Sequence, residues 1–86
     1  MRTTADLLKK ALETKPAKFW ADRYFIDRTT IAMSKKRGHL SPALAGNLAI
    51  DLGEDALRWI AVAQLEAERD HPLTDRLREM LNQTNR

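Results

Sequence analysis

The stretch WADRYFIDRTTIAMSKKRG, residues Trp20–Gly38, predicts two short helices joined by a tight apolar corner at residues 24–26. Asp27 can cap the second of these helices, which covers residues 28–37, and the closing glycine can end it. Ile31 is its one obvious buried anchor, and most of its other side chains are Arg, Thr, Ser or Lys. A helix with a single anchor leaves its polar groups free for another molecule, and groups of these types suit base edges in the DNA major groove.

Apolar residues at helical spacing also precede this stretch. Thr3 or Thr4 can cap a first helix, with Asp6 near its positive end. Pro16 disfavours helix at the residue before it and fits the first turn of the second helix. The apolar stripe of the first helix is Leu7, Leu8, Ala11 and Leu12. The inner set of the two helices that follow is expected to be Trp20, Ala21, Tyr24 and Ile31.

Three more helices are predicted downstream. A serine–proline start at residues 41–42 and a stop at Gly53 bound the fourth helix. The fifth covers residues 54–70, with its last five residues solvated, and His71-Pro72 breaks it. The end of the chain, residues 82–86, is expected to fray. The apolar stripe of the fourth helix is Leu44, Ala45, Leu48, Ala49 and Leu52. The apolar positions of the sixth helix are Leu73, Leu77, Met80 and Leu81.

These patterns predict an all-α protein, a compact bundle of five to six short helices. The whole chain, residues 1–86, is expected to be a single domain because its length fits one modest core. The two-helix motif covers residues 16–38 and is expected to lie within a DNA-binding core, residues 3–53. The C-terminal helices, residues 54–82, are expected to serve dimerisation.

Charge is distributed unevenly along this chain of net charge +3. Residues 1–40 hold ten Lys/Arg and four Asp/Glu, a net charge of +6, whereas residues 41–86 hold five and eight, a net charge of −3. A polyanion would be attracted to the basic half, which contains the motif. The lack of cysteine excludes disulfides and thiolate metal sites. With no apolar signal core and no membrane-length apolar run, a cytoplasmic protein is expected, associated with the bacterial nucleoid when bound to DNA.

The pattern resembles the lambda-repressor-like helix-turn-helix domains of phage Cro and CI proteins and their bacterial relatives, the XRE class. Small phage- or prophage-associated regulators of that class are the nearest resemblance. It covers roughly residues 3–82. The matching segments are Thr4-Ala-Asp-Leu-Leu8, Trp20–Gly38, residues 41–53 and Ala63–Arg69 followed by Pro72. The resemblance implies a lambda-repressor-like fold with a C-terminal helical extension, and a transcriptional repressor acting on a palindromic operator.

Ala21 matches the small residue that such domains place in the first motif helix, and Ile31 matches their buried aliphatic ten residues later. Three positions depart from the family pattern. Phe25 stands where glycine is usual, and a bulky residue is strained at positive φ. Ser34 stands where a second large apolar anchor is usual, and Gly38 comes about one residue late. These departures leave the register of the recognition helix open.

In the docking mode of this family, the recognition helix enters the major groove by its N-terminal turn. Arg28 is then expected to contact guanine, and the methyl groups of Thr29 and Ala32 to contact thymine. Lys18 is expected to anchor a phosphate together with backbone N–H groups of the second helix. The full base-contacting set is Arg28, Thr29, Thr30, Ala32, Met33 and Lys36. The full phosphate-contacting set is Ala17, Lys18, Asp27, Lys35, Arg37 and His39.

A single small domain makes few DNA contacts, so a homodimer on double-stranded DNA is expected. The last two helices offer more apolar surface than one small core absorbs. The predicted dimer interface is Trp59, Val62, Ala63, Leu73, Leu77, Met80 and Leu81.

No motif typical of catalysis, a cofactor or a metal occurs, so no enzyme, cofactor, metal site, membrane partner or small-molecule effector is expected. Trp20 and Trp59 are expected in the core, and His39 and His71 at the surface. Two alternatives stand beside the regulator. One is an antitoxin of the same fold that binds its operator and a toxin protein. The other is a helical protein-binding adaptor that does not bind DNA, which Phe25 and Ser34 favour.

Overall fold

Six helices account for most of the protein, which a computed structural model describes for residues 3–68 and 70–84. No strand occurs in those two ranges, so the all-α prediction is confirmed. The second motif helix covers the predicted residues 28–37. The helices are α1 (Thr4–Thr14), α2 (Ala17–Tyr24), α3 (Arg28–Arg37), α4 (Pro42–Asp51), α5 (Ala56–Ala67) and α6 (Pro72–Thr84).

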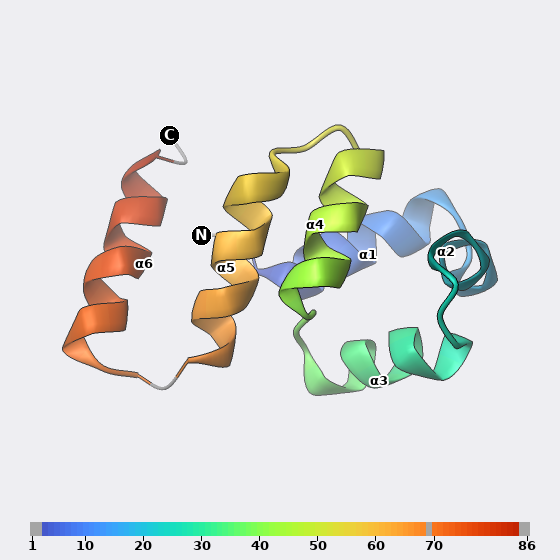
Figure 1. Ribbon diagram of the computed structural model, residues 1–86, viewed down its shortest axis with the longest axis horizontal. Helices are drawn as coiled ribbons and strands as arrows, with labels where there is room; N and C mark the ends of the chain where they lie inside the picture. Colours follow the sequence, from blue (N-terminus) through green and yellow to red (C-terminus); the bar gives the residue numbers. More distant parts are fainter. Residues whose placement is uncertain (1–2, 69, 85–86) are drawn as a thin grey trace.

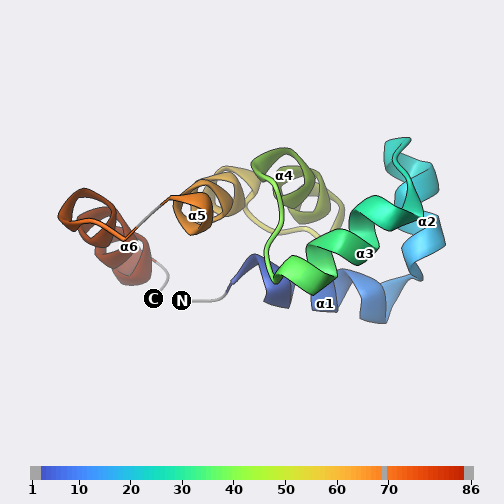
Figure 2. The same cartoon turned by 90° about the horizontal axis from the view of Figure 1, so that it is seen from below.

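The helices α4, α5 and α6 lie side by side, each antiparallel to the next (Figure 1). Seen from below, these three follow one another across the molecule, α1 lies to one side of α4 and α5, and α2 lies at the end opposite α6 (Figure 2). Helix α1 packs against α4 and α5, whereas α3 packs mainly against α2. The α2–turn–α3 unit therefore forms one end of the molecule, and α6 forms the other.

Both tryptophans belong to the core, as predicted. Trp20 is 4% exposed and its indole N–H donates to the carbonyl oxygen of Ala11 at 2.9 Å. Trp59 is 3% exposed and its indole N–H donates to Glu54 Oε1 at 3.1 Å. Tyr24 is half-buried against this core. The other buried apolar residues are Leu7, Leu8, Ala11, Ala21, Ile31, Leu40, Ala45, Leu48, Ala49, Val62, Ala63, Leu65 and Leu81.

Local capping explains where the helices begin. Thr3 and Asp6 form a reciprocal capping box at α1, and the hydroxyl of Ser41 accepts a backbone N–H at 3.3 Å at α4. Three predicted starts need correction. Helix α5 begins at Ala56, with Asp55 as its capping residue, rather than at residue 54. Pro16 is the extended residue before α2, with ψ of 162°, rather than part of its first turn. Asp27 does precede α3, but its carboxylate makes no capping hydrogen bond.

The end of α5 differs from the prediction. The helix stops at Ala67, and the next helix continues to Thr84, through positions that were expected to fray. Arg69 and residues 85–86 lie outside the described part of the chain. Glu66 was expected to be solvated but is half-buried, because its carboxylate accepts both the backbone N–H of Thr4, at 2.9 Å, and the Thr4 hydroxyl. A carboxylate at this place also suits the positive N-terminal end of α1.

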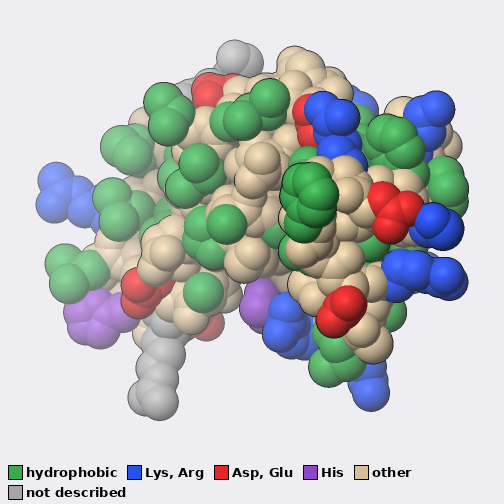
Figure 3. Space-filling model, turned by 45° about the vertical axis from the view of Figure 1, so that its right-hand side comes forward, with side chains coloured by type: hydrophobic (Ala, Val, Ile, Leu, Met, Phe, Trp, Pro, Cys, Tyr) green, Lys and Arg blue, Asp and Glu red, His purple; other side chains and the backbone are tan. Residues whose placement is uncertain are grey.

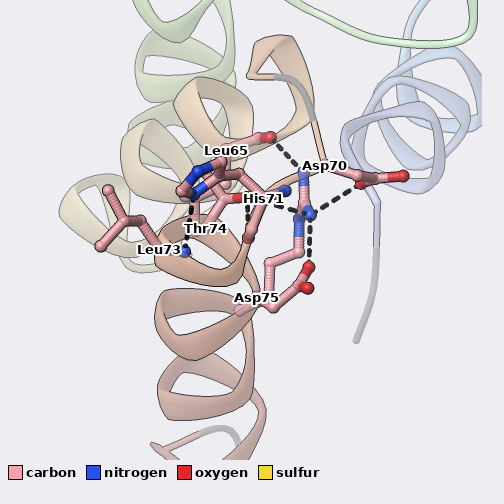
Figure 4. Close-up of polar contacts among 7 residues, drawn as sticks. Leu65, Asp70, His71, Leu73, Thr74 and Asp75 are labelled. Carbon is pink, nitrogen blue, oxygen red and sulfur yellow. Dashed lines mark hydrogen bonds and ion pairs between the residues drawn. The ribbon is translucent and has the colours of Figure 1, made fainter.

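Two arginines fix α6 against α5. Arg58 of α5 donates to the carbonyl oxygen of Leu81 at 2.8 Å. Arg78 of α6 donates to the carbonyl oxygen of Leu65 at 2.9 Å, and Figure 4 shows this acceptor together with two carboxylates around one guanidinium. These carboxylates belong to Asp70, at 2.9 Å, and Asp75, at 3.3 Å. The hydrogen bonds satisfy carbonyls near the ends of both helices, where intrahelical donors run out.

Candidate nucleic-acid interface

The corner between α2 and α3 is a tight left-handed turn. Phe25 has φ of 57° and ψ of 43°, a conformation that glycine adopts more readily than residues with a Cβ. The N–H of Ile26 reaches back to the carbonyl oxygen of Ala21 at 3.0 Å, and the N–H of Phe25 to that of Asp22 at 3.4 Å. This pair of bonds closes α2 as a Schellman motif with phenylalanine in the glycine position. The Phe25 side chain is 96% exposed, so the turn is made without burying the ring.

Two side chains of α3 are buried against the rest of the protein. Ile31 is 2% exposed and lies in the core, as predicted. Ser34, three residues later, is also 2% exposed, and its hydroxyl donates to the carbonyl oxygen of Thr30 at 2.9 Å. Ser34 therefore occupies the inward position of a second anchor while satisfying its own polar group. The helix was predicted to have one buried anchor. It has that anchor, Ile31, and a second buried side chain, Ser34, which is small and bonded within the helix.

The remaining side chains of α3 are exposed and divide into three rows. At about 100° per residue, the direction opposite the two buried side chains falls among Thr29, Ala32, Met33 and Lys36. Arg28 and Lys35 lie seven residues apart and line a depression on the α1 side. Thr30 and Arg37 also lie seven apart and line a depression on the α4 side. All six predicted base-contacting residues are exposed on α3, but Arg28 and Thr30 flank the outward row instead of belonging to it.

Positive charge concentrates at the C-terminal end of α3. Lys35, Lys36 and Arg37 form its last turn, and none of them makes an ion pair with the described residues. Cations suit a helix C-terminus on dipole grounds alone, so this cluster also has a purely local explanation. Gly38 follows in a left-handed conformation, with φ of 83° and its N–H bonded to the carbonyl oxygen of Ser34 at 3.0 Å.

The other residues predicted to contact phosphates differ in exposure and in whether their charge is already paired. Ala17 begins α2, and Lys18 forms an exposed ion pair with Asp22 at 2.7 Å, so part of its charge is already balanced. Asp27 is exposed at the start of α3, and His39 is half-buried after its end. These positions surround α3 at both ends, although Lys18 would have to exchange its carboxylate partner for a phosphate.

A polar network that the sequence analysis did not anticipate fixes α2 on α4. Two nitrogens of Arg23 donate to the two carboxylate oxygens of Asp51, each at 2.7 Å, and the hydroxyl of Tyr24 donates to Asp51 at 2.5 Å. The hydrogen bonds from Arg23 and then Tyr24 lower the pKa of Asp51 to about 2. Burial, followed by the hydrogen bond with Asp51, raises the pKa of Tyr24 above its ordinary value. The network links the C-terminal end of α2 to the C-terminal end of α4.

The predicted dimer interface divides into two groups. Trp59, Val62 and Ala63 are at most 3% exposed within the single chain. They belong to its own core, so their prediction as dimer-interface residues is wrong. Leu81 is also buried, at 8%. The side chains of α6 that stay exposed are Leu73 at 72%, Leu77 at 46% and Met80 at 51%.

Further apolar side chains are exposed on neighbouring helices, beyond those that were predicted. Ile50 of α4 is 66% exposed, and Leu57 and Ile60 of α5 are 79% and 39% exposed. Figure 3 shows many hydrophobic side chains over the half of the visible face that holds α5 and α6, whereas Lys and Arg gather on the other half. Exposed aliphatic side chains are thus most frequent on α5 and α6, although Phe19, Phe25 and Met33 are exposed at the basic end as well.

No family model, curated protein or solved structure matches this chain. Within residues 3–68 and 70–84, no group of three or more His, Asp or Glu is arranged to hold a metal ion. None of the helices in this described part could cross a membrane. The function must therefore be argued from the α2–turn–α3 unit and the surfaces beside it.

Proposed function

We propose that this chain is a sequence-specific DNA-binding transcriptional regulator of the lambda-repressor-like type, acting as a Cro-like phage or prophage repressor. One observation carries the proposal. Helix α3 turns only Ile31 and Ser34 inward and leaves its other side chains on the surface, including three cations in its last turn that have no ion-pair partner among residues 3–68 and 70–84. Exposed donors on a helix at one end of the molecule, next to positive charge, suit a major groove and its phosphates.

The three rows of α3 suggest separate roles in that complex. The outward row, centred on Thr29, Ala32 and Met33, faces the groove floor, where methyl groups can contact thymine. Arg28, on the flank toward α1, reaches guanine through the first turn of the helix, for about 1–3 kcal/mol of discrimination. Lys35 and Arg37 lie on opposite flanks, which suits phosphates of the two strands.

We further propose that α6 forms the two-fold contact of a homodimer. Leu73, Leu77 and Met80 are spaced four and three residues apart, which places them in one stripe. Exposed apolar stripes of this kind mark interaction surfaces. Leu77→Glu is expected to convert the dimer to a monomer in sedimentation velocity, whereas Leu57→Glu, an equivalent change on α5, is expected to leave it dimeric. A wild-type protein that stays monomeric at high micromolar concentration, with and without DNA, would contradict this part.

The DNA-binding proposal is tested by fluorescence anisotropy with two duplexes, the DNA flanking the coding region of this protein and a scrambled duplex, each at two salt concentrations. The native duplex is expected to bind more tightly at both. Arg28→Ala is expected to lose about tenfold of that preference. Lys10→Ala, which removes a cation of α1 that pairs with Glu54, is the control for the lost charge and should bind nearly as wild type does. Equal binding to both duplexes that vanishes at high salt would contradict sequence-specific recognition.

An antitoxin of the same fold is the second candidate, because exposed apolar residues continue beyond α6. Ile50 and Leu57 are among the most exposed large apolar side chains of the protein, and an α6 dimer leaves them available for another protein. The antitoxin role predicts that Leu57→Glu keeps operator binding but loses binding to a co-encoded toxin. Absence of any salt-dependent DNA binding would favour the third possibility, a protein-binding adaptor.

A further inference from the structure

An apolar trough separates α1 from α3. Its larger part, about 440 Å³, is floored by Leu8 and Leu12 of α1, and Lys35 of α3 closes its far side. A second part, about 320 Å³, shares Leu12 and Lys35 and continues along α3 to Arg28, Thr29 and Ala32. Leu12 and Lys35 line both parts, so the two parts adjoin at these residues. The volume of the larger part lies in the range of small-molecule sites.

The trough exists because the two facing helix surfaces do not match in size. Helix α1 presents Ala5, Leu8 and Leu12 at three- and four-residue spacing, which is an apolar face. The facing side of α3 offers Ala32 and the stem of Lys35, which are too small or too polar to cover it. Leu12 therefore stays only half-buried.

Cations dominate the rim of this apolar floor. Lys9 stands at the α1 end, Lys35 in the middle and Arg28 at the far end, whereas Glu13 is the one acid among the lining residues. None of these three cations has an ion-pair partner in the part of the chain that the structure describes. An apolar floor with a positive rim complements a molecule that has an apolar body and one negative charge.

We propose that the trough binds a small amphiphilic anion, an alkyl carboxylate about as long as octanoate. Its carboxylate pairs with Lys9, and its chain lies on Leu8 and Leu12 and extends toward α3. Arg28 and Thr29 line the adjoining part, so an anion that reaches past Leu12 hinders their contact with DNA. This competition rests on the proposed function, whereas binding of the anion does not. The anion would then act as an inducer, an effector that the sequence analysis did not expect.

Binding is tested without DNA by titrating ¹⁵N-labelled protein with sodium octanoate and following backbone amide shifts. The proposal expects saturable shifts within residues 5–13 and 28–35, and none with sodium acetate, which lacks the apolar body. Equal responses to octanoate and 1-octanol, or octanoate shifts centred on the exposed leucines of α6, would overturn it, because they would indicate general hydrophobic binding. Absence of saturable shifts would overturn it as well.

Two variants probe the trough itself. Lys9→Glu is expected to weaken octanoate binding about fivefold, since it replaces an attraction at the rim with a repulsion. Arg76→Glu makes the same charge change on α6 and should leave the affinity unchanged. Ala5→Leu fills the trough and should reduce binding further. Equal effects of Lys9→Glu and Arg76→Glu would refute the assigned position of the carboxylate.

The anisotropy assay then separates the two proposals. Octanoate is expected to raise the apparent Kd for the native duplex in wild type and less so in Lys9→Glu. Octanoate binding without any effect on DNA binding would overturn the competition but keep the trough as a ligand site. If no DNA binds at all, the amide shifts still decide the ligand proposal.

Discussion

Replacement of Phe25 by glycine is expected to stabilise this protein, even though it removes an aromatic ring. Phe25 holds φ of 57° and ψ of 43° at the turn before α3. Its side chain is 96% exposed, so the ring gives almost no burial energy. The main contribution of this side chain to the free energy of unfolding is therefore unfavourable: the strain of a left-handed conformation in a residue that has a Cβ.

The magnitude follows from two opposing terms. A left-handed conformation costs a residue with a Cβ about 1–2 kcal/mol. Glycine avoids that cost but loses about 0.5–1 kcal/mol through the greater freedom of its unfolded chain. The difference favours Phe25→Gly by about 0.7 kcal/mol, which corresponds to a rise in Tm of about 3–6 °C in a domain of this size.

Thermal melts followed by circular dichroism, together with urea titrations, measure this change. Phe25→Ala is the matched control, because it removes the ring but keeps a Cβ in the left-handed conformation. Its free energy of unfolding should lie within about 0.5 kcal/mol of wild type. The reasoning is refuted if Phe25→Gly is no more stable than Phe25→Ala, since strain at this turn would then be absent.

Three further changes test other parts of the structure by the same melts and urea titrations. Gly38→Ala should destabilise by about 1 kcal/mol, because φ is 83° and the added methyl meets no atom within 4 Å, so strain is the sole effect; an unchanged Tm would contradict this. Thr4→Val should cost about 2 kcal/mol, because it leaves the buried N–H of Leu40 unpaired and removes the hydroxyl's bond to Glu66, whereas the exposed control Thr14→Val should cost much less. Asp51→Asn should flatten the pH dependence of stability. Hydrogen bonds from Arg23 lower the Asp51 pKa from 3.8 to about 2, so its stabilisation is present above pH 3.8 and is lost as the pH falls toward 2; identical wild-type and variant slopes there would refute it.

The helix boundaries were predictable because they depend on residues close together in the sequence. The capping box at Thr3, the start at Ser41 and the stop at Gly38 each involve groups within four residues. Such signals operate before any tertiary contact forms, so the sequence is enough to locate them. The same locality explains why the 28–37 helix was placed correctly, whereas the end of α5, which lacks a glycine stop, was placed too late.

The polar network and the orientation of α6 were not predictable, because both depend on partners far away in the sequence. Asp51 is the last residue of α4, and its partners lie 27 and 28 residues earlier on α2. Helix α6 carries the apolar stripe that was predicted to form a dimer interface, but the sequence does not show which side of the helix packs against α5. Hydrogen bonds from Arg58 and Arg78 to carbonyls of the opposite helix turn its Thr74 and Arg78 side inward and leave Leu73 exposed. Periodicity indicates that a stripe exists but not which neighbour covers it.

The three departures from the family pattern leave the geometry of α3 intact, each for a separate physical reason. Phe25 adopts the left-handed conformation of the usual glycine and accepts the strain with its ring in solvent. Ser34 keeps the inward direction of a second anchor by bonding its hydroxyl to Thr30. Gly38 closes the helix one turn after Ser34, so the later stop only adds a residue at the basic end. Since Ile31 and Ser34 both face inward, Thr29, Met33 and Lys36 lie on the opposite side of α3. That exposed side is the one that the proposed DNA contact requires.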